Sequence, residues 1–366
     1  MEESHSIDYY VNNSLENNSG SVKTSHKIII DDSRIMNDID NDSIQFVVTS
    51  PPYPMIAMWD EMFSEQNKDI EKALADHDDD SAFELMHQEL DKVWKEVYRV
   101  LEPGCIACIN IGDATRKIDN SFKLYSNHAR ILSFCTELGF HVLPDILWRK
   151  QSNKPNKFMG SGMLPVGAYV TLEHEYILIL RKGAKREFNT ELEKSNRQRS
   201  AFFWEERNKW FSDIWEGLMG DRQKLNNKNI RERSAAYPFE LAYRLITMFS
   251  VQGDIVLDPY LGTSTTTLGA MASGRNSIGY EIDSNFMEII NLRMDTLLEL
   301  ANEYNNTRIK QHLDFVKKRE KENGKLSYFN ERYKFPVMTR QETRMVIPMV
   351  KTFSKIKDNI FEIEYA

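Results

Sequence analysis

Residues 256–283 read VLDPYLGTSTTTLGAMASGRNSIGYEID, and this stretch decides the fold. An apolar run ends at Asp258, a loop containing Gly262 follows, and a helical segment begins near Thr265. A second apolar run ends at the acidic residue Glu281, about 20 residues further on. This order suits a nucleoside ligand, because a glycine loop lets backbone approach the ligand and the acid accepts from ribose hydroxyls. An ordinary strand-to-helix turn is the alternative for this stretch taken alone.

The same rhythm extends outward along the chain. Apolar runs such as KIIID (27–31), IQFVVT (44–49) and CIACINIG (105–112) are typical of buried strands, and apolar residues recur at helical spacing over 81–101. The expected strands are 27–31, 44–49, 105–112, 141–148, 175–181, 255–259 and 276–283, and the expected helices are 81–101, 129–139, 237–249, a segment from about 265, and 284–304. Strands that alternate with helices predict an α/β protein with a mostly parallel sheet.

Three stretches depart from this rhythm. Residues 1–26 are rich in Asn, Ser and Glu, which predicts a flexible tail. Residues 151–235 are rich in Asn, Lys and Arg with interleaved aromatic residues, which predicts an insertion or a separate lobe. Residues 305–366 are mixed and charged, and the sequence assigns them no role. The α/β rhythm itself occupies 27–150 and 236–304.

Composition and charge indicate a globular protein with one basic segment. The chain has 366 residues, 41% of them hydrophobic and 28% charged, which excludes a disordered, collagen-like or coiled-coil chain. The net charge is -8, but residues 60–91 carry 12 acidic and 2 basic side chains, whereas residues 181–233 carry 14 basic and 9 acidic ones. A basic segment on an acidic body is compatible with binding a phosphate backbone.

The three cysteines, Cys105, Cys108 and Cys135, are too few for a disulfide framework. Cys105 and Cys108 have half of a zinc-site spacing but lie in a strand-like run, so buried thiols are expected and no metal site is predicted. Reduced thiols favour a cytoplasmic location. The polar N-terminus shows no signal-peptide core, and no run of about 18 apolar residues predicts a membrane span.

A second motif, Ser50-Pro51-Pro52-Tyr53, directly follows the apolar run 44–49, and its prolines restrict the backbone and leave a carbonyl without a local amide partner. A hydroxyl, this carbonyl and an aromatic ring then meet at the carboxyl end of a strand, where open α/β sheets bind ligands. The trio suits a planar heterocycle whose exocyclic amine donates to Ser50 and Pro51 while its ring stacks on Tyr53. Such contacts localise the nitrogen lone pair for attack on an electrophilic methyl held in line. A proline-stiffened loop with a packed tyrosine is the structural alternative.

These motifs resemble those of a known family, the S-adenosylmethionine-dependent DNA amino-methyltransferases of the beta group. The family's catalytic motif, (Asp/Asn/Ser)-Pro-Pro-Tyr, is matched by residues 50–53, and its cofactor motif, Asp-Pro-Phe-x-Gly-x-Gly-Thr-Thr, by residues 258–266. In the beta order the catalytic motif comes first, a target-recognition region follows and the cofactor motif comes last, as in this chain. Further stretches that look like the family are IIIDDSRIM, LEPGCIACINIGD, DILWRK, HEYILILRK and YPFELAYRLITMFSVQGDIVLDP.

The resemblance covers about 28–300 and implies a Rossmann-like methyltransferase fold with circularly permuted motif order. It implies that 27–150 is the catalytic half of the methyltransferase domain, that 151–235 is an inserted target-recognition region, and that 236–304 is the cofactor-binding half. Residues 305–366 would then be a C-terminal extension.

Roles for single residues are also implied by the resemblance. Asp32 would contact the adenine amine of S-adenosylmethionine, and Glu281 would hold its ribose. The residues implied to line the methionine part are Asp258, Tyr260, Gly262, Thr265 and Thr266. The residues implied to bind and activate the target base are Thr49, Ser50, Pro51, Pro52 and Tyr53, and Thr49 is also an expected cofactor contact. Tyr260 replaces the usual Phe, which is a mild change. Ser264 replaces the second glycine and Asp31 replaces a glycine before Asp32, so both are expected to bring side chains near the cofactor loop and to affect the affinity for the cofactor.

The resemblance implies methylation of an exocyclic amine in double-stranded DNA, with the base flipped out of the helix. Ser-Pro-Pro-Tyr favours the N4 amine of cytosine. The N6 amine of adenine stays open, because both amines flank a ring acceptor and offer two hydrogens. An RNA or protein amide methyltransferase is disfavoured by Ser50 and by the motif order. A DNA-binding module without activity is disfavoured by the intact catalytic motif.

The basic insertion is the expected DNA-recognition region, because its cations would contact phosphates. The candidate DNA contacts are Lys154, Lys157, Lys182, Lys185, Arg186, Arg197 and Arg199. A cognate restriction endonuclease is a further candidate partner, and the sequence indicates no oligomeric state.

Overall fold

The computed structural model describes residues 23–118, 121–150, 159–160, 162–218 and 237–366. Residues 1–22 of the expected tail, and Lys154 and Lys157 among the expected DNA contacts, lie outside this part.

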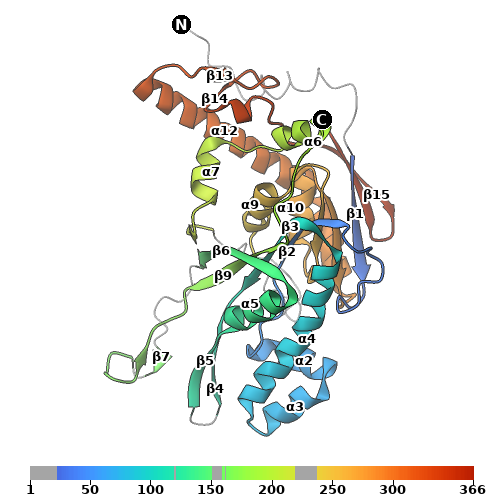
Figure 1. The fold of residues 1–366 in the computed structure, drawn as a ribbon, viewed down its shortest axis with the longest axis vertical. Helices are drawn as coiled ribbons and strands as arrows, with labels where there is room; N and C mark the ends of the chain where they lie inside the picture. Colours follow the sequence, from blue (N-terminus) through green and yellow to red (C-terminus); the bar gives the residue numbers. More distant parts are fainter. Residues whose placement is uncertain (1–22, 119–120, 151–158, 161, 219–236) are drawn as a thin grey trace.

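Within the described residues, ten strands form one sheet in the order β10-β6-β9-β3-β2-β11-β12-β1-β16-β15 (Figure 1). Their bounds are β1 Lys23–Ile30, β2 Ile44–Thr49, β3 Leu101–Ile111, β6 Phe140–Arg149, β9 His174–Lys182, β10 Ile214–Trp215, β11 Ile255–Asp258, β12 Asn276–Glu281, β15 Val350–Lys357 and β16 Ile360–Tyr365. Three small pairs lie outside this sheet: β4 Ala114–Ile118 with β5 Ser121–Tyr125, β7 Met159–Gly160 with β8 Ala168–Tyr169, and β13 Tyr328–Phe329 with β14 Pro336–Val337.

The centre of the sheet is parallel, as the sequence predicted. Strands β3, β2, β11, β12 and β1 run in one direction, whereas β9 and β16 pair antiparallel at the two sides of this block. Five of the six residues of β2 are buried, because helices cover both faces of the sheet. The α/β class with a mostly parallel sheet is therefore confirmed, with antiparallel strands added at its margins.

Helices pack on both faces of this sheet. Their bounds are η1 Ala57–Trp59, α2 Asp60–Gln66, α3 Lys68–Ala75, α4 Asp79–Val100, α5 Asn127–Leu138, α6 Glu191–Arg199, α7 Trp204–Trp210, α9 Phe239–Phe249, α10 Thr265–Ser273, α11 Phe286–Asp295, α12 Leu297–Asn323 and η2 Arg340–Glu342. Side chains alternate along β2, so Val47 joins the core that contains Leu90 and Trp94 of α4, while Phe46 and Val48 join the core of α9 and α10 on the other face.

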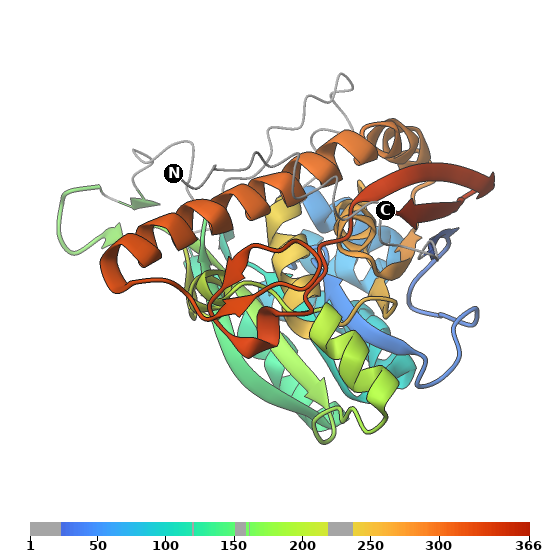
Figure 2. The same ribbon diagram turned by 90° about the horizontal axis from the view of Figure 1, so that it is seen from above.

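The helix expected over 284–304 is two helices in the structure. They meet at Thr296, whose amide and hydroxyl both donate to the Arg293 carbonyl. The second helix, α12, continues well past 304, because Ile309 and Val316 keep one of its faces buried. Figure 2 shows α12 crossing the molecule on one side, next to the β15–β16 hairpin.

Three expected boundaries differ from the structure. Residues 23–26, assigned to the tail, belong to β1, where Thr24 and His26 are buried beside β16. Within 151–235, β9 lies between β3 and β6, so this part of the expected insertion belongs to the main sheet. The extension 305–366 supplies β15 and β16, which extend the sheet past β1.

Cys105, Cys108 and Cys135 are buried free thiols, as expected. In the ranges that the structure describes, no three His, Cys, Asp or Glu side chains form a metal-binding group. None of the helices described has both the length and the apolar surface needed to cross a lipid bilayer.

Candidate active site

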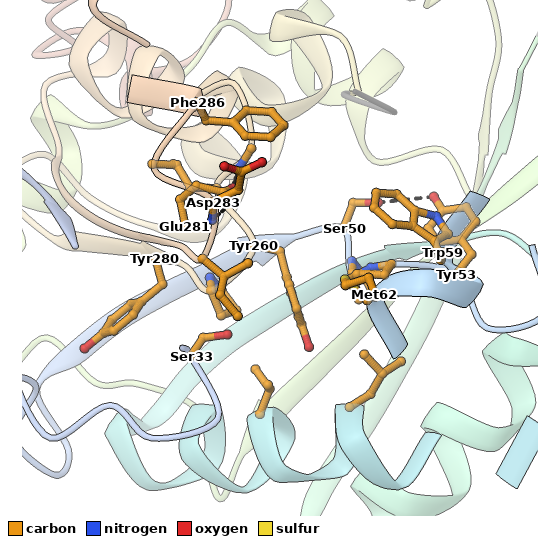
Figure 3. Close-up of a pocket in the computed structure, with 18 of the residues that line it drawn as sticks. Ser33, Ser50, Tyr53, Trp59, Met62, Tyr260, Tyr280, Glu281, Asp283 and Phe286 are labelled. Atoms are coloured by element: carbon orange, nitrogen blue, oxygen red, sulfur yellow. Dashed lines mark hydrogen bonds between the residues drawn. The ribbon is translucent and has the colours of Figure 1, made fainter. Parts of the chain in front are cut away.

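A cavity of about 840 Å³ opens at the carboxyl ends of the parallel strands (Figure 3). Four segments at the ends of β1, β2, β11 and β12 line it, with residues 31–34, 50–53, 259–263 and 265, and 280–283, 285 and 286. These segments are distant in sequence and converge because parallel strands end at the same edge of a sheet. The cavity therefore joins the two motifs that the sequence singled out.

One end of the cavity holds Ser50, Pro51, Pro52 and Tyr53. The Ser50 Oγ lies 3.2 Å from the Tyr53 Oη. Within the described residues, the Pro51 carbonyl accepts no hydrogen bond, as the proline spacing predicted. Burial and the nearby Glu175 charge raise the pKa of Tyr53 well above its usual value, so its hydroxyl stays protonated and donates.

A buried polar network fixes the two hydroxyls. Tyr53 donates to the Glu175 Oε2 over 3.0 Å, and the Asn110 Nδ2 donates to that same oxygen over 2.7 Å and to the Tyr53 Oη over 2.9 Å. The Lys150 Nζ donates to the other Glu175 oxygen over 2.7 Å. Lys150 is charged and Asn110 is held by strand β3, so together they hold the Glu175 carboxylate and give Tyr53 a defined position.

Asn110, Lys150 and Glu175 were not assigned roles from the sequence. Asn110 and Glu175 lie in strands β3 and β9, which were predicted from their apolar residues. The sequence feature that could have identified them is a polar residue in an otherwise apolar strand, near the end of the strand that lies at the same edge of the sheet as Ser50. At 2% and 8% exposure, these two side chains need the partners they have.

The ring of Tyr53 lies against Gly112, directly after β3. A Cβ at Gly112 would come within 2.9 Å of the ring carbon Cε2, so only glycine leaves room for the ring in this position. Trp59 and Met62 line the same cavity, and Figure 3 labels both in the part of the view that contains Ser50 and Tyr53. The contribution of Trp59 and Met62 to the cavity was not expected, since η1 and α2 carry no motif.

The other end of the cavity is built around Glu281. Its carboxylate accepts from the Gly262 amide over 2.8 Å and from the Asp283 amide over 2.9 Å. Gly262 has a φ of +52°, which glycine adopts without strain and which turns its amide toward Glu281. Burial raises the pKa of Glu281 to about 7.

The affinity for S-adenosylmethionine is expected to fall as the pH drops through 7. The resemblance implies that Glu281 holds the ribose of the cofactor, and an ionised carboxylate can accept from both ribose hydroxyls. With a pKa of about 7, this carboxyl is mostly protonated at pH 6. The dissociation constant should therefore be about tenfold higher at pH 6 than at pH 8. Isothermal titration at both pH values checks this. Glu281→Gln should bind weakly with no comparable pH dependence, and an equal pH dependence in the variant would remove the ribose assignment.

Asp258, Thr49 and Thr266 do not line the cavity but lie beneath it. Asp258 is 1% exposed and accepts from the Thr49 Oγ1 over 2.6 Å and from the Tyr260 amide over 3.0 Å. The hydroxyls of Thr266 and Tyr237 also reach this carboxylate. Burial raises the pKa of Asp258, and the four donors counteract this effect. These residues tie the ends of β2 and β11 together, and their expected contacts with the cofactor stay a prediction.

Asp32 lines the cavity but shares its carboxylate with Arg34. The Arg34 guanidinium donates to both Asp32 oxygens and to Glu89, 2.6 Å away. Burial acts to raise the pKa of Asp32, but the Arg34 hydrogen bonds and charge outweigh it and lower the pKa. Arg34 was not predicted, and it leaves Asp32 few free lone pairs for an adenine amine.

Ser264, in the place of the family's second glycine, does not line the cavity. It is fully buried with a φ of +64°, and its hydroxyl has no hydrogen-bond partner. Ser264 therefore keeps the left-handed backbone of a glycine. Its side chain lowers the stability of the fold and does not occupy the space of the cofactor. Tyr260 and Thr265 do line the cavity, and Figure 3 shows Tyr260 pointing between Ser33 and Met62.

Ser264→Gly is expected to raise the free energy of unfolding by about 1 kcal/mol, because it relieves left-handed backbone strain and removes an unpaired buried hydroxyl. Denaturant unfolding measures this. Ser264→Ala keeps the strain and should gain less. A destabilised Ser264→Gly variant would contradict the account.

The structure places five of the predicted basic DNA contacts at the edge of the sheet opposite the catalytic motif, and their binding to DNA stays a prediction. Strand β9 is antiparallel to β3, so it ends at Lys182 on the amino edge of the parallel strands, opposite Ser50. The Lys182 ammonium donates to Asp42 and to the carbonyls of Tyr98 and Leu101, and Arg186 forms two hydrogen bonds with Asp254. The remaining predicted contacts on this edge are Lys185, Arg197 and Arg199, of which Lys185 and Arg197 line a second cavity with Arg186. These five side chains are therefore not near the catalytic motif.

Comparison with known proteins agrees with this geometry. Residues 44–292 match the model of the N6_N4_Mtase family, described as DNA methylase. The chain belongs to this family. It is 56% identical to the Type II methyltransferase M.MthZI of Methanothermobacter thermautotrophicus over 94% of this chain and 96% of that one, and 51% identical to the Type II methyltransferase M.MjaI of Methanocaldococcus jannaschii over 74% and 91%. The protein TTHA0409 of Thermus thermophilus, solved with S-adenosyl-L-methionine, is 30% identical and superposes with a TM-score of 0.56 over 73% of this chain and 94% of that one. The expected DNA amino-methyltransferase fold and family are thus confirmed.

Proposed function

We propose that this DNA methylase is a Type II enzyme that methylates the exocyclic N4 amine of a cytosine flipped out of duplex DNA, using S-adenosyl-L-methionine. The observation that carries the proposal is Ser50, the first residue of Ser-Pro-Pro-Tyr, at the end of a cavity whose other end presents Glu281. The two Type II relatives support the context of a restriction-modification system, in which a cognate endonuclease would be the partner.

The Glu281 end of the cavity fits the cofactor. Two acceptor oxygens of a buried carboxylate suit ribose hydroxyls, and the Gly262 loop leaves its surface open to a ligand. Asp32, Tyr260 and Thr265 line the same space, and its volume of about 840 Å³ is ample for a nucleoside cofactor beside a base. S-adenosyl-L-methionine supplies the electrophilic methyl group when it is bound here.

The Ser50 end suits an amine in a planar ring. The Ser50 Oγ and the Pro51 carbonyl each accept one amine hydrogen, which localises the nitrogen lone pair. Tyr53 offers its ring for stacking, and its hydroxyl is held by Glu175 and Asn110. After methyl transfer the nitrogen carries the methyl group and both of its hydrogens, so it releases one of them as a proton. Because a paired base cannot enter such a cavity, the base is flipped from the duplex.

Cytosine is favoured over adenine by residue 50. The family resemblance associates Ser at this position with cytosine and Asp with adenine. Both bases offer an amine next to a ring acceptor, so the hydrogen-bonding pattern alone permits either. Adenine N6 methylation is therefore the alternative, with the same fold and the same site.

Methylome sequencing of a methylation-deficient bacterial host that expresses the protein tests the proposal. The expected result is N4-methylcytosine at one position of a single short motif. N6-methyladenine at that motif would overturn the target base and leave the cavity assignment standing.

A further inference from the structure

A second cavity, of about 880 Å³, lies at the amino edge of the parallel strands, opposite the catalytic motif. Its walls come from the start of β3, the loop after β9, α6, the end of α9 and η2. Ile106 lines this cavity, and Asn110 of the first site lies four residues further along β3, so about 13 Å of strand separates the two. The second cavity has the volume of a small-molecule site and is distinct from the one described above.

The lining of this cavity is rich in cations. The basic residues in it are Arg181, Lys185, Arg186, Lys194, Arg197 and Arg207, and Glu342 is the one acid among the described residues that line it. Two of the cations are neutralised, because Arg186 pairs with Asp254 and Lys194 with Glu191. The other four have no carboxylate partner in the described part of the chain, so the cavity has an excess of positive charge.

The cations are held in place by the surrounding fold. The Arg186 amide donates to the Gly104 carbonyl over 3.2 Å, which pins the loop that carries Lys185 against β3. Gly104 has a φ of +88°, and a Cβ on it would come within 2.6 Å of the Arg186 nitrogen. The Arg197 guanidinium lies 4.9 Å from the centre of the Phe188 ring. Groups that are positioned before a ligand arrives lose less entropy when it binds.

Polar groups without partners also line the cavity. Thr247 of α9 is 5% exposed, and its Oγ1 has no hydrogen-bond partner among the described residues. Buried hydroxyls are normally paired, so this one marks a place where a ligand atom is missing. The side-chain amides of Gln198, Asn208 and Gln341 are also unpaired within the ranges described. Amides both donate and accept, as the edges of nucleobases do.

Aromatic rings complete the lining. Trp204 is 40% exposed and Phe211 is 45% exposed, and both line the cavity. The Phe202 ring stacks on Phe211, with ring centroids 5.7 Å apart, and this contact fixes the plane of Phe211. Exposed rings beside unpaired cations suit a ligand that combines a planar heterocycle with an anionic group.

We propose that the second cavity binds a nucleoside phosphate, with its phosphates at Lys185, Arg197 and Arg207 and its base beside Phe211. Arginine and lysine are the side chains that proteins use most for phosphate groups. A DNA duplex fits this cavity less well, because its bases are stacked inside and its phosphates lie on a convex surface. The inference goes beyond the methylation reaction and is independent of the proposed target base.

Binding of ADP, GDP, CDP and UDP, measured by titration calorimetry, tests the proposal. S-adenosylmethionine is present at saturation, so that the adenosine site of the cofactor is filled. At least one diphosphate is expected to bind once per chain with a dissociation constant of about 100 μM or lower. Inorganic pyrophosphate and the corresponding nucleoside should each bind at least about tenfold more weakly, because each keeps only one part of the ligand.

Two variants locate the ligand in this cavity. The double variant Arg197→Gln, Arg207→Gln is expected to raise the dissociation constant at least about 30-fold, since it removes two charges that meet the phosphates. Thr247→Val should raise it about fivefold without lowering the melting temperature, because the hydroxyl that it removes has no partner in the free protein. Lys209→Gln is the matched control, since Lys209 is exposed on α7 two residues from Arg207 and does not line the cavity.

The Lys209→Gln variant should bind the diphosphate like the parent. Failure of all four diphosphates to bind would overturn the proposal. It would also be overturned if the double variant or Thr247→Val bound the diphosphate as tightly as the parent. If the chain bound no diphosphate and the double variant weakened the binding of duplex DNA, these cations would be DNA contacts instead.

Discussion

Ser50→Ala is expected to lower kcat for DNA methylation by about 10²–10³ while leaving the dissociation constant for S-adenosylmethionine within about twofold. The Ser50 Oγ lies at the Tyr53 end of the cavity, 3.2 Å from the Tyr53 hydroxyl. The variant removes an acceptor that meets the reacting amine, but touches nothing at the Glu281 end. Single-turnover kinetics with labelled cofactor, together with titration calorimetry, give the two quantities separately.

Ser43→Ala is the control, because Ser43 precedes the other end of β2 and its hydroxyl donates to the nearby Asp40 carbonyl. It should retain full activity. If Ser50→Ala kept the parental kcat, the base-binding role of the motif would be wrong. If it lost cofactor binding instead, Ser50 would belong to the cofactor site.

Glu175→Gln is expected to lower kcat by about 10² with KM for DNA within about threefold. Glutamine keeps the size of the side chain but loses the charge that holds Lys150 at 2.7 Å and accepts from Tyr53 and Asn110. Tyr53 and Ser50 then lose their fixed geometry relative to the incoming base. Glu175 acts through these residues, so it is a positioning residue, and the effect falls on kcat.

Glu173→Gln provides the comparison for Glu175. Glu173 lies two residues earlier, pairs with Arg149 at the surface and is half exposed, so its variant should behave like the parent. Thermal unfolding of both variants separates misfolding from mispositioning. A fully active Glu175→Gln variant, or one that merely unfolds at lower temperature, would remove the positioning role.

The sequence predicted the residues that lie within short motifs. Ser50–Tyr53 and Gly262 follow strands that are clear apolar runs, and Glu281 is the last residue of such a strand. The carboxyl ends of parallel strands meet at one edge of a sheet. The strand assignments and the parallel direction of the strands are therefore enough to predict that these residues line one cavity.

Asn110, Lys150 and Glu175 could not be predicted in this way. Glu175 reaches Tyr53 because β9 runs antiparallel between β3, which carries Asn110, and β6, which Lys150 follows. A periodic pattern carries no information on the direction of a strand or on its neighbours in the sheet. The same reversal explains why Lys182 and Arg186 lie at the edge of the sheet opposite Ser50, since the direction of β9 decides which edge they occupy. A basic composition shows that cations are present but not which edge of the sheet they face.

Ser264 shows a different limit of sequence reasoning. A serine in place of a family glycine was expected to crowd the cofactor loop. The backbone instead keeps the left-handed conformation and directs the side chain into the protein interior. A motif departure can thus change stability without changing the site.

Mass spectrometry of nucleosides from DNA methylated by the purified protein with isotopically labelled S-adenosylmethionine tests the central claim most directly. The DNA should contain the motif identified in the expression host, and the Ser50→Ala variant serves as the background. The account predicts labelled N4-methylcytosine that is absent with the variant. Labelled N6-methyladenine, or label in any other nucleoside, would contradict it.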